Sequence, residues 1–505
     1  MKILDHDLQS IQEVRVILAA AKQAQKVLQS YSQEQIDHIV AQVAAAAEQS
    51  AVKLAQMAHE ETGFGRWEDK AIKNTFASRQ LYRHIKDMKT VGVIAIHETD
   101  QIVDIAVPVG VIAGLIPSTN PTSTVIYKSL LALKTGNAIV FSPHPSARRC
   151  ISETVALLSS AAVQAGAPEG ILGCLSILSM PGTNELMKHR DTSLILATGG
   201  EAMVKAAYSS GTPAIGVGPG NGPAFIERSA DIPRAVKQII DSKTFDYGVI
   251  CASEQSIVVE KESRQQVVQE LLRQGAYFLN SEQSAQLGSF LLRGNGTINP
   301  QAVGKSPERL AAMAGFSIPA GSRVLISEQT TVSRSNPYSR EKLAPVLAFY
   351  EAEDWKSACE RCMELLEGEG KGHTMTIHSR NEAVIQEFAL HKQVSRLLVN
   401  TPAALGGIGA TTNLPPAMTL GCGTVGGSST SDNIGPMNLL NIRRLAYGVR
   451  EMEDLREPVP VCAAKQVTAE AAAVSAAPAA PTAPTAMNEA QLEAIVQQLL
   501  RQLMG

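Results

Sequence analysis

The chain has 505 residues, of which 45% are hydrophobic and 18% are charged, and its formal net charge at pH 7 is −3. This length predicts two or three domains, and the small net charge without a long basic stretch argues against a nucleic-acid-binding protein. Seven scattered cysteines are typical of reduced cytoplasmic thiols. The polar residues 1–10 do not form a signal peptide, and the longest apolar run, 105–117, is too short to cross a membrane.

The chain opens with helical patterns and then changes to a hairpin. In the first ninety residues, Ile36, Ile39 and Val43 lie on one helical stripe. Two short alternating runs, 91–96 and 101–107, flank a polar tip. That pattern predicts a β-hairpin or arm.

From residue 109, strands alternate with helices, which predicts a mostly parallel sheet covered on both faces. Ligands of such sheets bind beyond the carboxyl ends of the strands, so the loops after these strands should meet at one crevice. A second α/β stretch runs from about 241 to 421, and a glycine-rich segment follows to about 457. The predicted strands of the first sheet are 109–116, 138–141, 172–178, 193–197 and 214–217.

The end of the chain has a different composition. Residues 463–486 are almost wholly Ala, Pro, Thr and Val, which predicts an extended linker. Residues 487–505 have the apolar spacing of an amphipathic helix, carried by Leu492, Ile495, Val496, Leu499, Leu500 and Leu503. So short a helix is marginal in water unless it docks. It either folds back on its own domain or binds a separate partner, and the long linker favours the partner.

No metal is expected. Cys359 and Cys362 form a C-x-x-C within the helical segment 355–366, but no second pair accompanies them. The ten histidines form no recognised metal-binding motif.

The most informative segment is 243–255, where Cys251 lies between an apolar run and a small-residue turn. By position alone, Cys251 fits a buried core cysteine as well as a nucleophile. The segment resembles the nucleophile motif of the aldehyde dehydrogenase superfamily, most of all acylating acetaldehyde dehydrogenases and the aldehyde dehydrogenase half of bifunctional aldehyde–alcohol dehydrogenases. The resemblance covers about residues 1–457 and implies that Cys251 is the catalytic thiolate.

Asn120 lies in the segment 117–123, which resembles the loop whose asparagine helps to form the oxyanion hole of this family. The resemblance implies that Asn120 and the Cys251 backbone N–H donate to the substrate oxygen. A helix N-cap is the alternative role of Asn120, and the two roles are compatible because the cap uses only its oxygen.

The segments 142–146 and 197–201 resemble the family's cofactor loops, and the resemblance implies NAD. Glu341 lies in a segment that resembles the one holding the nicotinamide ribose, with a solvated surface acid as the alternative reading. Arg148 and Arg149 keep NADP open as an alternative. The implied cofactor-binding residues are Ser118, Thr119, Ser142, His144, Thr198, Gly199, Gly200, Gly218 and Glu341.

Residues 215–221 contain no acid, whereas the matching loop of hydrolytic aldehyde dehydrogenases carries a glutamate that activates water. A thioester without a nearby base resists water but is open to a thiol, which predicts coenzyme A as the acyl acceptor. We therefore expect reversible conversion of a short aldehyde, CoA and NAD to acyl-CoA and NADH. Acetaldehyde is the first choice, with propionaldehyde and sulfoacetaldehyde as alternatives. A hydrolytic enzyme and a catalytically silent scaffold are the competing hypotheses.

The resemblance also implies the architecture, an α/β aldehyde dehydrogenase fold in a homodimer or homotetramer. The tail resembles encapsulation peptides of enzymes in bacterial microcompartments, which implies shell or cargo proteins as partners and a location in the lumen. Its one Arg and two Glu argue against membrane binding. The expected parts are a Rossmann-like NAD domain (1–240) with its oligomerisation arm (91–107), a catalytic domain (241–425), an oligomerisation segment (426–460), a linker (461–486) and a targeting helix (487–505).

Overall fold

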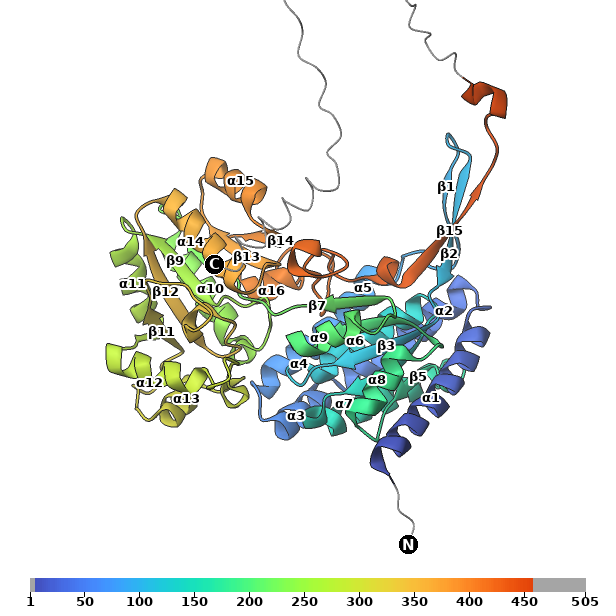
Figure 1. The fold of residues 1–505 in the computed structure, drawn as a ribbon, viewed down its shortest axis with the longest axis horizontal. Coiled ribbons are helices and arrows are strands. Elements are labelled where there is room, and N and C mark those ends of the chain that lie inside the picture. The colour runs from blue at the N-terminus through green and yellow to red at the C-terminus, as the bar shows by residue number, and fades with distance from the viewer. Residues whose placement is uncertain (1–4, 457–505) are drawn as a thin grey trace, which may run out of the picture. The chain divides into compact units, whose positions relative to one another are not determined.

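A computed structural model describes residues 5–456, and Figure 1 shows their arrangement. The chain as far as Tyr447 forms one unit, and a second unit begins at Gly448, where a short 3-10 helix spans Met452–Leu455. The expected linker and targeting helix lie outside the described residues. Within residues 5–456, no helix combines the length and the apolar character that a membrane span requires.

The N-terminal helices form because the sequence supplies both caps and an apolar stripe. The Asp5 side chain accepts the backbone N–H groups of Asp7 and Leu8 at the start of α1, and Ser32 with Gln35 forms a capping box on α2. The predicted stripe of α2 is buried. These helices are α1 (His6–Leu28), α2 (Gln33–Gln49), α3 (Ala51–Thr62), α4 (Trp67–Thr75), the π-helical turn η1 (Phe76–Gln80) and α5 (Leu81–Ile85).

The first sheet is parallel, as the sequence predicted, with strand order β5-β4-β3-β6-β7. Every residue of β3 and β4 is buried, as is typical of strands covered on both faces. Its strands are β3 (Val111–Ile116), β4 (Ala138–Pro143), β5 (Leu172–Cys174), β6 (Thr192–Thr198) and β7 (Ala214–Val217). Its connecting helices are α6 (Pro121–Lys134), α7 (Arg148–Gln164), α8 (Met180–Lys188) and α9 (Glu201–Tyr208).

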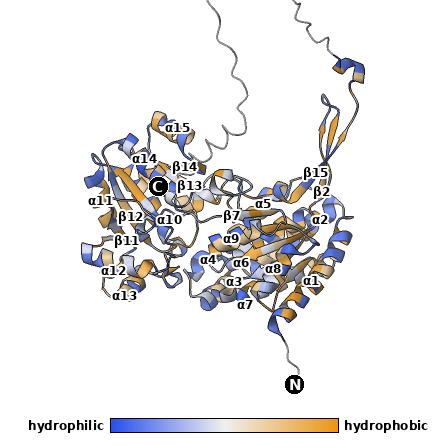
Figure 2. Ribbon diagram, in the orientation of Figure 1, coloured by the Kyte–Doolittle hydropathy of each residue, from blue (hydrophilic) through white to orange (hydrophobic). Residues whose placement is uncertain are grey.

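The second sheet is also wholly parallel, in the order β10-β11-β12-β9-β8-β13-β14. Its first strand along the chain, β8 (Pro223–Ile226), directly follows β7. The sheet therefore begins before residue 241, where the catalytic domain was predicted to start. Figure 2 shows mainly hydrophobic residues in the strands of both sheets. The strands are β8 (Pro223–Ile226), β9 (Ser256–Glu260), β10 (Ala276–Phe278), β11 (Val324–Glu328), β12 (Val346–Ala352), β13 (Gly372–His378) and β14 (Val394–Val399). The helices are α10 (Ile232–Thr244), α11 (Arg264–Arg273), α12 (Ser281–Leu291), α13 (Pro307–Ala314), α14 (Trp355–Gly368), α15 (Glu382–His391) and α16 (Ala403–Gly407).

The predicted hairpin is present, and it carries a third strand. Strands β1 (Gly92–His97) and β2 (Ile102–Pro108) pair antiparallel, and β15 (Leu440–Ala446) adds to the other edge of β2. Figure 1 shows this arm standing away from the two sheets. Several apolar side chains on the arm are exposed, namely those of Val93, Ile96 and Leu445.

Candidate active site

All eleven residues that the sequence assigned to catalysis or cofactor binding line one cavity of about 480 Å³. The cavity lies at the carboxyl ends of β3, β4, β6 and β7, where a parallel sheet binds its ligands. These residues are Ser118, Thr119, Asn120, Ser142, His144, Thr198, Gly199, Gly200, Gly218, Cys251 and Glu341. The structure therefore brings together segments that are more than 200 residues apart in the chain, from Ser118 to Glu341.

Cys251 is partly buried between the 3-10 turn η3 (Phe245–Gly248) and strand β9. Burial raises the pKa of its thiol to about 12, and the negative charge of Glu341 acts in the same direction. The positive charge of Arg396 opposes this rise in pKa. The Arg396 guanidinium is buried and donates hydrogen bonds to the backbone carbonyls of His373 and Ser431, both at 3.1 Å.

The loop after β7 packs against Cys251 so closely that one position requires glycine. A Cβ on Gly220 would lie 1.9 Å from the Cys251 carbonyl oxygen, a separation that no side chain can occupy. The Gly220 N–H donates to Glu341 Oε1 at 2.9 Å. Gly220 therefore fixes the Glu341 carboxyl relative to the backbone of Cys251.

Glu341 is the single acidic residue among the described residues that line the cavity. Burial raises the pKa of its carboxyl to about 8, the Gly220 N–H lowers it, and the charge of Glu369 raises it. The Glu341 backbone N–H donates to Glu369 Oε2 at 2.7 Å. These contacts differ from those of a solvated surface acid, which was the alternative reading of Glu341.

Asn120 precedes helix α6, but its side chain makes no capping hydrogen bond. Its Oδ1 instead accepts a hydrogen bond from Lys73, and its Nδ2 donates to the Val249 carbonyl at 3.2 Å and to Thr119 Oγ1 at 3.3 Å. The amide nitrogen therefore lies on the side of the segment 243–255, which contains Cys251.

The segments 142–146 and 197–201, which are predicted to bind the cofactor, use their polar groups differently. Helix α9 begins after Gly200, and no side chain caps its first turn. A helix N-terminus of this kind attracts phosphate. His144 Nδ1 accepts the Ser146 N–H at 3.2 Å, so its proton sits on Nε2, and burial lowers the pKa of the ring.

Sequence reasoning missed the contribution of α8 to the cavity. Leu178, Ser179, Met180 and Thr183 also line it, and Thr183 Oγ1 lies 3.2 Å from Ser142 Oγ. Ser179 caps α8 by accepting the Gly182 N–H at 3.1 Å. A serine followed by Met-Pro after the third predicted strand is the signal that indicates this helix start.

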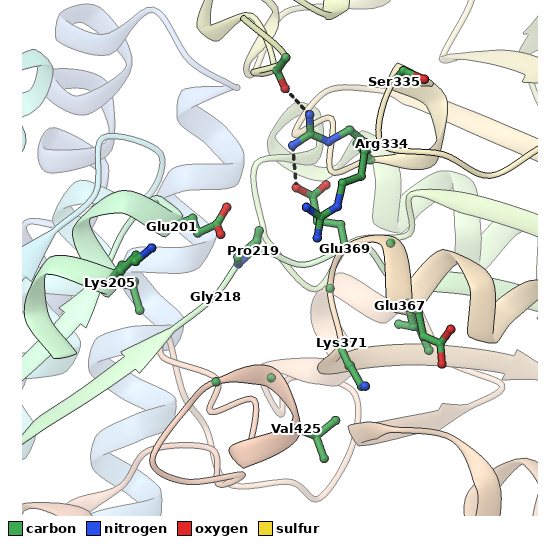
Figure 3. A pocket seen from close by; sticks show the side chains of 18 of the residues that line it. Glu201, Lys205, Gly218, Pro219, Arg334, Ser335, Glu367, Glu369, Lys371 and Val425 are labelled. Carbon is green, nitrogen blue, oxygen red and sulfur yellow. Dashed lines mark hydrogen bonds and ion pairs between the residues drawn. The ribbon is translucent and has the colours of Figure 1, made fainter. Parts of the chain in front are cut away.

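A second, larger cavity of about 1150 Å³ meets the first at Gly218 and Pro219. Figure 3 shows Glu201 and Lys205 of α9 on one side of it and Glu369 and Lys371 on the other. The Arg340–Glu369 ion pair, 3.1 Å long, lies on its wall.

Among the residues that the structure describes, no three His, Cys, Asp or Glu side chains are grouped so that they could hold a metal ion. Cys359 and Cys362 both lie on α14, where Cys362 is buried and the Cys359 sulfur contacts Lys392 Nζ.

Comparison with known proteins identifies the family. The model of the Aldehyde dehydrogenase family matches residues 2–285. The Bifunctional aldehyde-alcohol dehydrogenase AdhE of Escherichia coli K12 is 44% identical over 448 residues, which are 88% of this chain and 50% of that protein. The chain thus spans about half the length of the bifunctional relatives. The Succinate-semialdehyde dehydrogenase (acetylating) of Clostridium kluyveri is 36% identical over 87% of this chain and 96% of its own length.

Solved structures agree with this assignment. An acetylating aldehyde dehydrogenase from Geobacillus thermoglucosidasius shares 52% identity and a TM-score of 0.88, covering 89% of this chain and 99% of that one. A propionaldehyde dehydrogenase from a bacterial microcompartment of Clostridium phytofermentans shares 28% identity and a TM-score of 0.78, covering 86% and 97%. The chain therefore belongs to the aldehyde dehydrogenase family, in its acylating branch.

Proposed function

We propose that this chain oxidises a short-chain aldehyde to an acyl-CoA, with NAD as hydride acceptor and a thioester on Cys251 as intermediate. One observation carries the proposal. Cys251 shares a cavity with Asn120 and the cofactor loops, while the loop 215–221 beside it contains no acid.

The residues present fit a nicotinamide dinucleotide. Ser142 and His144 stand at the end of β4, where the adenosine ribose would lie, and the uncapped start of α9 suits the pyrophosphate. The Glu341 carboxyl suits the two hydroxyl groups of the nicotinamide ribose. When bound, the cofactor accepts a hydride from the substrate carbon.

The preference for NAD over NADP is supported at the start of α7. Arg149 and Cys150 donate their backbone N–H groups to the Glu61 carboxylate at 2.8 and 2.7 Å. A carboxylate thus already uses the helix terminus that a 2′-phosphate would seek, and its charge repels a second anion. The Arg149 guanidinium also pairs with Glu60 at 3.8 Å.

Each chemical step uses a group of this chain. The Cys251 thiolate forms a C–S bond with the aldehyde carbon, and the carbonyl oxygen takes the electron pair. Asn120 Nδ2 and the Cys251 N–H donate to that oxygen. Loss of hydride leaves a thioester on Cys251. The CoA thiol then gives its proton to water, its sulfur bonds to the acyl carbon, and the C–S bond to Cys251 breaks to free the thiolate. One thioester replaces another, so the exchange is reversible.

The cavity protects the thioester from water because its acid is poorly placed to act as a base. The Glu341 Oε1 is already engaged, because it accepts the Gly220 N–H at 2.9 Å. Val217, which also lines the cavity, cannot take up a proton. A hydrolytic enzyme needs such a base.

The test is NADH formation from acetaldehyde with and without CoA, in the wild type and in Cys251→Ala. We expect turnover that requires both CoA and Cys251. Equal rates without CoA would favour hydrolysis, and full activity of Cys251→Ala would exclude the proposal. A panel with propionaldehyde, succinate semialdehyde and sulfoacetaldehyde then identifies the substrate, since relatives are named for these compounds.

We further propose that the β1–β2–β15 arm joins copies of the chain into a homodimer or homotetramer, and that residues 487–505 direct the enzyme into a bacterial microcompartment. A microcompartment setting is named for the Clostridium phytofermentans structure. Deleting 487–505 should release the enzyme from purified shells while its kinetics stay unchanged. Unchanged recovery with shells would refute the targeting role.

A further inference from the structure

Two lysines of helix α4 are buried against the nucleophile segment. The Lys70 and Lys73 side chains are 3% and 2% exposed, and both ammonium groups pair with Asp246, whose side chain is fully buried. A buried charge is tolerated only when it is paired. An unpaired lysine or aspartate would be strongly destabilising at this buried site. The ion pairs therefore hold α4 against the residues just before Cys251.

Asp246 lies in an unusual backbone conformation that this pairing helps to maintain. Asp246 and Tyr247 have φ angles of 48° and 50°, in the left-handed region that residues other than glycine rarely adopt. Such positions persist when surrounding contacts determine them. The Asp246 carboxylate accepts the Arg66 N–H at 2.6 Å and Lys70 Nζ at 3.0 Å, and the Asp246 N–H donates to Asp69 at 2.9 Å.

Lys73 connects this buried carboxylate to the Asn120 amide, because its ammonium donates to both Asp246 Oδ2 and Asn120 Oδ1. An ammonium group has three donors and no acceptor, so the amide must turn its oxygen toward Lys73. Its NH₂ group then lies on the other side, where it donates to Val249 at 3.2 Å.

We propose that Lys73 is a positioning residue that holds the Asn120 amide with its NH₂ group toward the carbonyl oxygen of the substrate on Cys251. The inference rests on the proposed oxyanion role of Asn120. Lys73 does not line the cavity and acts only through Asn120, while Asp246 keeps Lys73 in place. Burial lowers the pKa of Lys73 to about 8, and the charge of Asp246 opposes this and sustains the ammonium form.

The experiment is a double-mutant cycle on the full chain that combines Lys73→Met with Asn120→Ala. Losing an oxyanion donor costs about 100- to 1000-fold in kcat, and a misplaced donor costs on the order of 100-fold. We expect Lys73→Met to lower kcat by about 10- to 100-fold while KM for NAD changes little. In the Asn120→Ala background, the same change should cost no more than about twofold, because residues that act as a unit are not additive.

Lys134→Met is the matched control for the loss of a buried lysine. Lys134 is fully buried, pairs with Asp37, donates to the Lys86 carbonyl and does not line the cavity. Its loss should lower the thermal midpoint as Lys73→Met does, but leave kcat near that of the wild type. If Lys73→Met does not fold, Lys73→Gln replaces it, since glutamine keeps a polar group for the buried Asp246 but is uncharged and one bond shorter than lysine.

Equal losses of kcat in the two backgrounds would overturn the inference, for Lys73→Gln as for Lys73→Met. So would a folded Lys73→Met enzyme with wild-type kcat, or an Asn120→Ala enzyme with undiminished kcat. Failure of the proposed function is visible separately, as turnover that needs neither CoA nor Cys251.

Discussion

Cys251 and Glu341 line the same cavity, and burial together with the negative charge of Glu341 raises the pKa of the Cys251 thiol to about 12. A thiol with this pKa has a thiolate fraction of about 10⁻⁵ at pH 7. The proposed nucleophile is therefore mainly a neutral thiol in the free enzyme, and we expect its thiolate to form as ligands bind. A positively charged nicotinamide ring beside Glu341 has the sign that favours the thiolate.

Alkylation of Cys251 by iodoacetamide should show this directly. The rate should rise about tenfold for each pH unit between 7 and 10, because only the thiolate reacts. Adding NAD should increase the rate at constant pH, because the positive charge of the nicotinamide ring favours the thiolate. Mass spectrometry of the Cys251 peptide follows the reaction, with Cys251→Ala as the background for other cysteines. A rate that levels off below pH 8 would contradict the raised pKa.

Glu341→Gln should raise the alkylation rate of Cys251 and lower kcat/KM for NAD. Removing the negative charge lowers the pKa of Cys251, so alkylation of the free enzyme becomes faster. Losing charged hydrogen bonds to the ribose costs about 1.5–3 kcal/mol, or about 10- to 150-fold in kcat/KM for NAD. Steady-state kinetics and alkylation together check both signs, and an unchanged kcat/KM for NAD would exclude the ribose role.

Val217→Glu should create a hydrolytic activity. Val217 is 4% exposed and lines the cavity beside Cys251, so a glutamate there would have a pKa raised toward neutrality, as a general base requires. We expect NADH formation without CoA to rise at least tenfold, a modest part of what a general base contributes. Val217→Gln, which has the same size but cannot take a proton, should show no rise. Equal rates in the two variants would argue against water activation.

The strands of the sheets were predictable because they are buried on both faces and read as apolar runs between turn signals. The predicted strand 214–217 has the bounds of β7, whereas the strand predicted to reach residue 178 ends at Cys174. Strand β15 was not predicted, because Leu440 is its single buried residue and its partner β2 is distant in sequence, with Ile442 opposite Ala106. A strand that pairs at the edge of a small sheet buries few side chains, so its sequence shows little apolar pattern.

The residues of the candidate site could be predicted where they lie in recognisable local sequence motifs. Cys251, Asn120 and Glu341 lie in motifs that resemble a known family, and the parallel sheet explains why their loops meet. The Lys73–Asp246 pair was not predictable, since lysines on a short helix normally face solvent. Their burial depends on partners 173 residues apart, a tertiary contact that no local pattern contains.

A buried acid near the nucleophile should make stability depend on pH. Glu254 is fully buried, and burial raises the pKa of its carboxyl from 4.5 to about 7. Between these values the folded protein keeps a proton on Glu254 that the unfolded chain releases, so the contribution of Glu254 to stability falls as pH rises, by at most about 1.4 kcal/mol per pH unit.

Glu254→Gln should remove this decline, because glutamine has no proton to lose and keeps an oxygen for the Ala403 N–H, which donates to Glu254 at 2.8 Å. Above pH 7 the buried Lys243 contributes a slope of the opposite sign, since burial lowers its pKa to about 7 and the unfolded chain then binds the extra proton. Thermal midpoints of wild type and Glu254→Gln from pH 5 to 9 measure both slopes, with the exposed Glu282→Gln as control. Parallel profiles for wild type and Glu254→Gln would show that Glu254 titrates alike in the folded and unfolded chain.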